Sequence, residues 1–346
     1  MKKHTFILPA FLIIALIFFS CKKDAPPDDN NTDITTTHGV FIVNEGNFQW
    51  SNASVTYKNF TNNDYNEDIF KSVNNRPLGD VAQSICYLNG YAYIVVNNSN
   101  KIEIVNLSDF SSIGVITGLG SPRYFLPVSA SKAYVSDLYN NYINVIDLST
   151  LAKTQSIPCN GSTEEMVLQN NIVYITNTRK NKIYLIDVNA DEITDSITVG
   201  FASNSLQIDK NGKLWVMCSG DVASNINASI HRINTQNKQV EQSFQLSTPL
   251  DIWDKMRINP SRDTLYYMNN GIFRMQINST LLPENVFIPQ GSSLFHGLAI
   301  NPVNSNIFVA DAVDYIQKGK VNFYSPDGVL LGTINTGIIP VDFYFY

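Results

Sequence analysis

Side chains suited to acid–base or nucleophilic chemistry are scarce in this sequence. It has four histidines among 346 residues. His4 and His38 lie near the N-terminus, and His231 occupies a repeated position of widely varying residue type, which predicts a solvent-facing side chain. Only His296 could serve a Ser-His-Asp site, and no partner to orient it is evident. No G-x-S-x-G, H-E-x-x-H or P-loop pattern occurs. We therefore predict no catalytic residue.

Carboxylates and cysteines form no metal-binding pattern either. Asp209 begins a DKNG segment that resembles the start of a calcium loop, but the distal Glu is missing, so a hairpin turn is the simpler interpretation. Glu164 and Glu165 are adjacent, and neighbours on a strand point to opposite faces, which places them poorly to act together. Beyond Cys21, three cysteines remain without metal-type spacing, which favours buried free thiols. We expect no metal and no catalytic cofactor.

Aromatic and polar residues in predicted loops indicate binding instead. Rings that form a floor, with a few convergent polar groups, are typical of a small-molecule or glycan site. The candidate ligand-binding residues are the aromatic Phe48, Trp50, Tyr139, Tyr142, Trp253, Phe295 and Tyr315, and the polar Arg76, Asp80, Arg123, Arg179 and His296. For any one of them, packing inside the fold is the alternative role.

Two repeated segment types must position these loops. The first is an apolar strand with a central aromatic residue, found at Phe41, Tyr93, Tyr134, Tyr174, Trp215, Tyr266 and Phe308. The second follows each of these and ends in a polar residue, at Asn59, Asn106, Asp147, Asp187, Asn234, Gln276 and Ser325. Asp and Asn favour turns, and Asn-Gly or Asp-Gly pairs mark hairpin tips. Seven all-strand repeats of about 44 residues predict an all-β, seven-bladed β-propeller with four-stranded antiparallel blades.

The C-terminal segment is expected to close this ring. Residues 340–346 resemble the start of each repeat, whereas the first repeat, at Val40, lacks that opening strand. These residues should therefore pair into blade 1 as its innermost strand and remove the free sheet edges. Loops between the second and third strands of each blade share one face with the connections between blades. The longest are 44–52, 219–228 and 311–320, and long loops on a rigid scaffold often carry function.

The N-terminus predicts export and a lipid anchor. Two lysines and an apolar run precede Ser20-Cys21, which is the layout of a lipoprotein signal peptide. We expect residues 1–20 to be removed and Cys21 to be acylated. Residues 21–38, dominated by Asp, Asn, Thr and Pro, would be a disordered tether before the propeller at 39–346. The expected location is the outer membrane, with the propeller held by its lipid and exposed at the cell surface.

The charge balance argues against nucleic acid as a partner. The formal net charge is −6 at pH 7, and the two leader lysines are among the basic residues counted. Binding to nucleic acid usually shows a basic patch or stripe, and none is visible. We expect a propeller that is monomeric and takes a small-molecule ligand.

Four segments resemble one known group: GVFIVNEGNFQWSNASVTYKN, RPLGDVAQSI, YIVVNNSNKIEIVNL and SPDGVLLGTI. Over residues 39–346 the chain is similar to the YncE-like propeller lipoproteins of the Bacteroidota. One branch, the BtuG lipoproteins, captures cobalamin and passes it to a TonB-dependent outer-membrane transporter. The resemblance implies a non-enzymatic binding protein, with vitamin B12 or another corrinoid as a bound ligand and not as a catalytic cofactor. No ligand contact of that branch is matched to a residue here.

Three functions stay open at the level of sequence. The first is non-enzymatic capture of a corrinoid at the cell surface for a transporter. The second is a glycan- or protein-binding surface module, because the same aromatic rings suit sugar faces. The third is a metal-dependent hydrolase or lactonase, which would need carboxylates and imidazoles converging on the channel axis. The sequence offers few of these.

Overall fold

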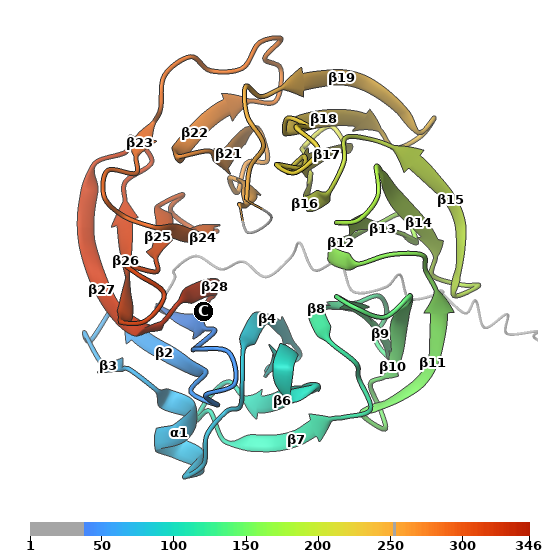
Figure 1. Cartoon of the computed structure of the whole chain (residues 1–346). Coiled ribbons are helices and arrows are strands. Elements are labelled where there is room, and N and C mark those ends of the chain that lie inside the picture. The colour runs from blue at the N-terminus through green and yellow to red at the C-terminus, as the bar shows by residue number, and fades with distance from the viewer. Residues whose placement is uncertain (1–37, 252–253) are drawn as a thin grey trace, which may run out of the picture. The chain divides into compact units, whose positions relative to one another are not determined.

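Seven four-stranded antiparallel sheets form a ring in the computed structural model, which describes residues 38–251 and 254–346 (Figure 1). Cys21, the predicted signal peptide, the predicted tether up to residue 37 and Trp253 lie outside the described residues. Within that described part, no helix is both long and apolar enough to cross a membrane. The prediction of a seven-bladed all-β propeller is confirmed.

The first four blades are listed from the channel outward. Blade 1 contains β28 (Pro340–Phe345), β1 (Gly39–Asn44), β2 (Ser54–Asn59) and β3 (Tyr65–Asn66). Blade 2 contains β4 (Ala82–Leu88), β5 (Tyr91–Val96), β6 (Lys101–Asn106) and β7 (Ser112–Ile116). Blade 3 contains β8 (Pro122–Pro127), β9 (Lys132–Asp137), β10 (Tyr142–Asp147) and β11 (Ala152–Pro158). Blade 4 contains β12 (Thr163–Gln169), β13 (Ile172–Asn177), β14 (Lys182–Asp187) and β15 (Glu192–Thr198).

The remaining blades follow the same order. Blade 5 contains β16 (Ser203–Ile208), β17 (Lys213–Cys218), β18 (Ser229–Asn234) and β19 (Gln239–Gln245). Blade 6 contains β20 (Met256–Ile258), β21 (Thr264–Met268), β22 (Gly271–Gln276) and β23 (Ile288–Pro289). Blade 7 contains β24 (Phe295–Ile300), β25 (Ile307–Asp311), β26 (Lys318–Tyr324) and β27 (Leu330–Ile338). The described part of the chain also contains two short helices, α1 (Ile69–Asn74) and the 3₁₀ turn η1 (Asn97–Ser99).

The hydrophobic core of the described residues is divided among the blade interfaces. Seven buried clusters occur, one between each pair of neighbouring blades. The repeated aromatic residue lies in these clusters, and Tyr134 and Trp215 are fully buried. The second strand of a blade is covered on both faces by its neighbours, so its sequence is almost continuously apolar. Because the apolar residues pack between blades, the inner strands are free to line the channel with polar side chains.

The C-terminal strand closes the ring as the sequence predicts. β28 pairs antiparallel with β1, with Phe41 opposite Tyr344 and Ile42 opposite Phe343. The rings of Phe41 and Tyr346 lie 5.0 Å apart. The backbone nitrogen of His38 donates to the carbonyl of Tyr346 at 2.6 Å, so the two ends of the described chain are neighbours. Closure leaves blade 1 with a full set of four strands built from both ends of the sequence.

One helix interrupts the otherwise all-β architecture. α1 begins after Asp68, whose carboxylate accepts a hydrogen bond from the backbone nitrogen of Lys71 at 3.1 Å, and ends at Asn75 in a left-handed conformation. This is ordinary helix capping. Phe70 points inward and is fully buried at the interface of blades 1 and 2. α1 follows β3, which is reduced to two residues.

Candidate functional site

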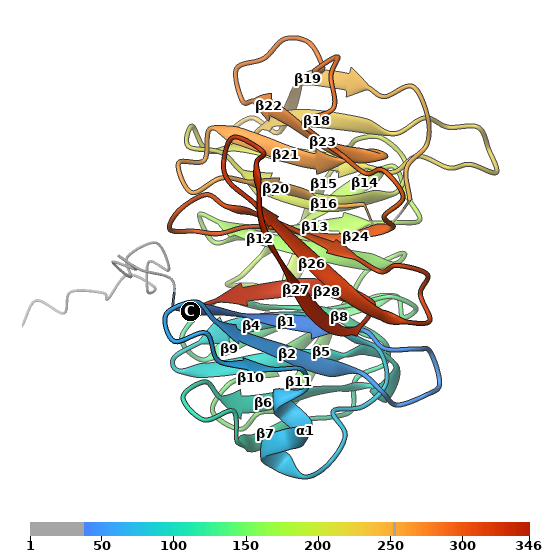
Figure 2. The ribbon, with the colours of Figure 1, turned by 90° about the vertical axis from the view of Figure 1, so that its left-hand side faces the viewer.

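The predicted ligand-binding residues concentrate on one face of the propeller, which we call the loop face. It contains the loops between the second and third strands of each blade and the connections between blades. Figure 2 shows the blades edge-on, with the end of β28 at the opposite face. The inner strands run from the loop face toward that opposite face. Their first residues therefore form the mouth of the channel beneath the loops.

The loops of blades 7, 1 and 2 are tied together by hydrogen bonds. The backbone nitrogen of Gln49 donates to both carboxylate oxygens of Asp80, at 3.1 and 2.9 Å, and Asn98 Nδ2 donates to Asp80 Oδ2 at 2.6 Å. Asn47 Nδ2 donates to the carbonyl of Tyr315 at 2.8 Å. Asp80 is buried and holds the 45–53 loop against blade 2. Its role in the structure is to position this loop.

Large aromatic side chains extend from this tied sector into solvent. Phe48 is 63% exposed and Trp50 is 75% exposed. Tyr315 is partly exposed, and its ring makes an edge contact with His296 at 5.5 Å. His296 is buried, with Nε2 3.3 Å from Glu45 Oε1. An exposed tryptophan and phenylalanine on a hydrogen-bonded loop is an arrangement that favours contact with a partner molecule.

A second aromatic group lies on blades 3 and 4. Tyr139 is 67% exposed, and the guanidinium carbon of Arg179 lies 5.9 Å from its ring centre, within cation–π distance. Tyr142 is half-buried at the start of β10 and has Lys153 Nζ at 4.3 Å from its ring. The structure thus groups the predicted residues into two sectors of the loop face.

The inner strands share a distortion at the channel mouth. Six of them carry a register shift near their first residues, where the inner strand has one residue more than the second strand it pairs with. In β28 the residue at the shift is Val341. In the other five strands the residues are Gln83, Arg123, Glu164, Asn204 and His296, which we call the bulge ring. A β-bulge redirects side chains, and bulges are enriched near functional sites. All five side chains are buried.

Arg123 is the centre of the bulge ring's hydrogen bonds. Its Nε donates to Glu164 Oε1 and Oε2 at 2.8 and 3.0 Å, and its Nη1 donates to Gln83 Oε1. Burial by itself disfavours the charged guanidinium, but Glu164, Tyr124 and Glu45 together outweigh burial and raise the pKa of Arg123. Arg123 therefore joins blades 2, 3 and 4 across the channel wall.

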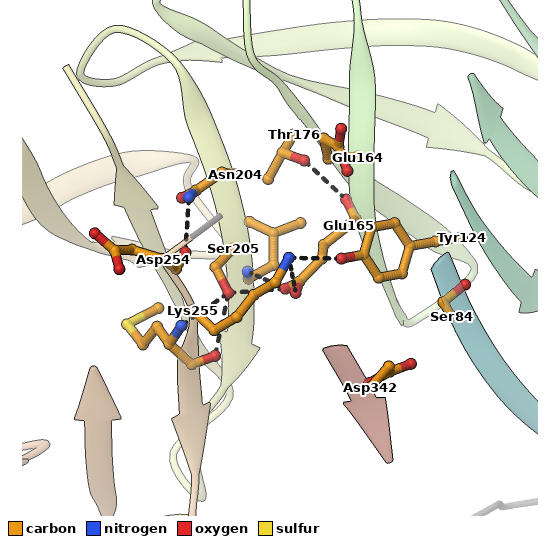
Figure 3. Close-up of polar contacts among 12 residues, drawn as sticks. Ser84, Tyr124, Glu164, Glu165, Thr176, Asn204, Ser205, Asp254, Lys255 and Asp342 are labelled. Atoms are coloured by element: carbon orange, nitrogen blue, oxygen red, sulfur yellow. Dashed lines mark hydrogen bonds and ion pairs between the residues drawn. The ribbon is translucent and has the colours of Figure 1, made fainter. Parts of the chain in front are cut away.

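A second layer of charged side chains lies one residue further along the inner strands (Figure 3). Lys255 Nζ donates to Tyr124 Oη at 2.7 Å and lies 4.0 Å from Glu165 Oε1. Glu165 also accepts hydrogen bonds from Ser205 Oγ, from the backbone nitrogen of Leu206 and from Arg257 Nη1, at 2.9, 3.0 and 2.9 Å. This layer links blades 3, 4, 5 and 6.

These contacts set the charge state of the second layer. Burial disfavours each charge, yet the Arg257 and Lys255 cations lower the pKa of Glu165 below its ordinary value. The same pairing raises the pKa of Lys255 and Arg257 despite their burial. Asp342 differs, since burial raises its pKa, and its carboxylate accepts hydrogen bonds from the backbone of Ile85, at 3.0 Å from Oδ2, and of Phe343. Within this layer, most charged side chains form an ion pair or a hydrogen bond with a group of opposite charge.

Several of the predicted site residues have other roles. Phe295 belongs to the hydrophobic cluster between blades 6 and 7, because the residue before the bulge turns into the core. Arg76 pairs with the buried Glu103 of blade 2 at 2.5 Å and covers the ring of Phe70. Neither side chain joins the two aromatic sectors. Trp253 lies outside the described residues, so its place is not given.

The prediction of a solvent-facing His231 is wrong. The side chain is buried between blades 4 and 5, and its Nε2 accepts a hydrogen bond from the backbone nitrogen of Gly200 at 2.9 Å. Ser229 Oγ and Ser243 Oγ each lie 2.9 Å from one of the ring nitrogens. The residue type varies at this repeated position because a different side chain packs at each blade interface. The variation does not arise from exposure to water.

Metal binding gains no support from the described residues, among which no group of three or more His, Cys, Asp or Glu side chains could hold an ion. Asp209 forms the predicted hairpin turn, with its Oδ1 accepting from the backbone nitrogens of Asn211 and Lys213. Glu164 and Glu165 turn to different partners, Arg123 and Arg257. The adjacent carboxylates therefore do not form a pair.

The second layer was not identified from sequence. Four of its residues lie directly after the bulge position of their strand: Tyr124, Glu165, Ser205 and Asp342. Lys255 directly precedes β20. A partial signal is present: in blades 2 to 6 a polar residue stands nine to eleven residues before the aromatic of the repeated strand, at Ser84, Tyr124, Glu165, Ser205 and Lys255. That signal marks the channel wall but not the pairing of the charges.

Comparison with solved structures supports the fold. A quinonprotein alcohol dehydrogenase-like protein from Bacteroides thetaiotaomicron VPI-5482 aligns with a TM-score of 0.70 and 17% identity, over 89% of this chain and 78% of that chain. A functionally unknown protein from Desulfotomaculum acetoxidans DSM 771 aligns at 0.66 and 11%, over 89% and 99%. Kuenenia stuttgartiensis hydrazine synthase aligns at 0.60 and 12%, over 75% and 88%. At these identities the likeness shows the propeller fold alone.

Comparison with protein families gives the relationship of the sequence itself. No protein of the curated set matches the chain significantly. The YncE-like and BtuG relationships inferred above remain predictions. One family matches residues 38–343, which is nearly the whole propeller. This protein therefore belongs to the family described as a domain of unknown function, DUF5074.

Proposed function

We propose that this protein is a non-enzymatic binding protein that captures a ligand on its loop face. The observation that carries the proposal is the exposure of Phe48 and Trp50 on a loop held in place by Asp80. Placing two large aromatic rings in solvent on a fixed loop gains little for folding, because most of each side chain remains exposed to water. A binding partner that covers them would recover that hydrophobic free energy.

The channel behind the loop face is less suited to a large ligand. Arg123, Glu164, Glu165 and Arg257 are bonded to one another across its wall. Separating such buried pairs would leave uncompensated charges, which costs about 3–5 kcal/mol per pair. A large flat ligand would therefore lie across the loops, with aromatic rings against its faces and polar groups such as His296 and Arg179 near its edge.

A corrinoid is the ligand that we propose first, on the strength of the sequence resemblance described above. In this proposal Cys21 carries the lipid, the protein sits at the outer surface of the outer membrane, and the ligand passes to a TonB-dependent transporter. Gly39 and Tyr346 lie at the face opposite the loops. A tether that leaves the propeller there would keep the loop face free for a ligand or a transporter.

Calorimetric titration of cyanocobalamin into residues 21–346 carrying Cys21→Ser tests this proposal. We expect tight one-to-one binding, and a combined Phe48→Ala and Trp50→Ala variant that weakens it at least about 30-fold, since even one aromatic anchor typically contributes about 2 kcal/mol. Tyr91→Ala is the matched control, because Tyr91 is a partly exposed aromatic at the other end of its blade. Both variants should unfold at nearly the wild-type temperature.

Absence of heat, with no retained colour after desalting, would reject the corrinoid. The broader proposal of a capture protein would then be tested on a glycan array with the same variants, because exposed Trp50 and Tyr139 rings also suit sugar faces. Glycan binding that the Phe48 and Trp50 substitutions leave unchanged would show that the loop face is not the binding surface.

A further inference from the structure

A separate cavity lies in the half of the channel farther from the loop face. Its volume is about 290 Å³. The lining residues that bear on its chemistry are Leu126, Glu165, Val167, Gln207, Arg257 and Asp342. These residues come from five different inner strands, β8, β12, β16, β20 and β28. The paired charges of the channel wall separate this cavity from the exposed aromatic rings of the loop face, so it is a second candidate site.

The cavity wall offers hydrogen-bonding groups of both charges. Arg257 uses Nη1 to reach Glu165 at 2.9 Å and the carbonyl of Met256 at 2.9 Å. No bond from its Nε or Nη2 to another described side chain or carbonyl is formed. Asp342 accepts at Oδ2 from the backbone of Ile85 at 3.0 Å, and no side chain of the described residues donates to it. One guanidinium and one carboxyl group thus retain bonding capacity toward the same space. A positively charged ligand group beside Asp342 would offset the burial that disfavours its charged form.

The remaining lining groups define what could fill the space between them. Leu126 and Val167 supply apolar wall, and Gln207 adds an amide whose Nε2 is occupied by the carbonyl of Met256. A purely anionic ligand would meet Glu165 and Asp342, and a purely cationic one would meet Arg257. A molecule with both charges would satisfy Arg257 and Asp342 together, because charge-assisted hydrogen bonds to guanidinium and carboxylate are among the strongest available.

We propose that this cavity binds a small zwitterion of the size of a single amino acid. Its carboxylate would bond to Arg257, its ammonium to Asp342, and its side chain would lie against Leu126 and Val167. The volume is near the lower end of the range for small-molecule sites, which excludes a ligand as large as a corrinoid. This site is independent of the loop face, so each proposal can fail without the other.

The test begins with thermal-shift measurements on the purified protein with each standard L-amino acid at millimolar concentration. The amino acid that stabilises most is then titrated calorimetrically beside its methyl ester and its N-acetyl form. The ester keeps only the positive charge and the N-acetyl form only the negative. We expect the zwitterion to bind at least tenfold more tightly than either blocked form, because each loses one charge-assisted contact. Failure of every amino acid to bind, or equal binding of the blocked forms, would overturn the proposal.

Two substitutions locate the binding. Asp342→Asn keeps the side-chain shape and removes the charge, and we expect at least tenfold weaker binding of the zwitterion with no loss of folding. Val167→Phe fills the cavity and should abolish binding without altering a charge. Leu330→Phe, on the exposed outer strand of blade 7, is the control for the added bulk. Unchanged binding in Asp342→Asn would contradict the site, whereas the Phe48 and Trp50 substitutions should leave this binding unaffected.

Discussion

Some buried ionisable side chains in this protein have a partner of opposite charge, and others have only neutral partners. Arg123 and Glu165 are buried with partners of opposite charge. His231 is buried with neutral partners only, the hydroxyls of Ser229 and Ser243 and the backbone of Gly200. A buried imidazole without a carboxylate resists protonation, because the charged form loses its hydration. Burial accordingly lowers the pKa of His231 to about 4.

This shift predicts a pH-dependent stability that depends on His231. Its folded-state pKa is below the value of 6.5 in the unfolded chain, so between pH 6.5 and 4 the unfolded chain binds more protons. The stabilisation is therefore fully present above pH 6.5 and is lost as the pH falls toward 4. A shift of this size corresponds to about 3 kcal/mol. Denaturant unfolding at a series of pH values should show that the free energy of unfolding falls less steeply below pH 6.5 in His231→Gln than in the wild-type protein. Parallel curves for the two proteins would contradict the argument.

At the scale of single elements, the channel mouth carries backbone strain. Val81, Ala202 and Ile339 each precede the first residue of an inner strand and have φ values of 56°, 59° and 57°. Such left-handed values are unfavourable for residues with a Cβ, most of all for β-branched ones. The carbonyls of Val81 and Ile339 accept hydrogen bonds from Asn97 and Glu45 of the loop face. The strain is thus maintained by the same connections that position the loops.

Replacing Val81 with glycine tests this interpretation. Glycine adopts the left-handed conformation at no steric cost but loses more entropy on folding, so we expect unchanged stability or a gain of up to about 1 kcal/mol. Val240 is the matched control, since it is a partly exposed valine in β19 without a positive φ. Val240→Gly should cost about 1 kcal/mol in chemical unfolding. If Val81→Gly loses as much stability as Val240→Gly, the left-handed backbone at Val81 does not store strain.

The strands could be predicted from sequence because the same pattern of apolar, aromatic and polar residues recurs in every repeat. Tyr134 and Trp215 stand in matching positions of different blades, so one ambiguous segment is corrected by six others. The short helix at Phe70 has no counterpart in other repeats, and six helical residues are too few for a periodic signal.

The candidate site was predicted only in part. Arg123 and His296 were found because they are polar residues at strand starts. Glu165, Lys255 and Asp342 were not, since their pairing depends on the bulges and on contacts between blades that are distant in sequence. Exposure of Phe48 and Trp50 followed from the length of their loop, but the bond from Gln49 to Asp80 that fixes the loop could not be inferred from residue types.

At the scale of the whole molecule, stability depends on ring closure. β28 supplies Phe343 and Phe345 to the cluster between blades 7 and 1, and Val341 to the cluster between blades 1 and 2. It also brings Asp342 into the channel wall. One six-residue strand therefore completes a sheet, two blade interfaces and part of a candidate site.

Deletion of residues 338–346 should destabilise the propeller strongly. The deletion removes the hydrogen-bonded partner of β1 and exposes the apolar residues of two clusters, and a single buried aromatic already contributes about 3–5 kcal/mol. We expect no cooperative melting transition, or one far below that of the full chain. A synthetic peptide of residues 338–346 added in excess should restore it at least in part. A melting temperature equal to that of the full chain would show that β28 does not hold the ring closed.

The pairing of β1 with β28 also constrains how the protein is made. Val40 is among the first residues of the propeller to be synthesised, yet its partner Phe345 follows only after all the other blades. Until then β1 presents an unpaired edge that could pair with other chains. A chain released or cut before this point would carry six complete blades and still be recognisable to cellular proteases and chaperones as unfinished. The ring can therefore close only after the segment that contains β28 has been synthesised.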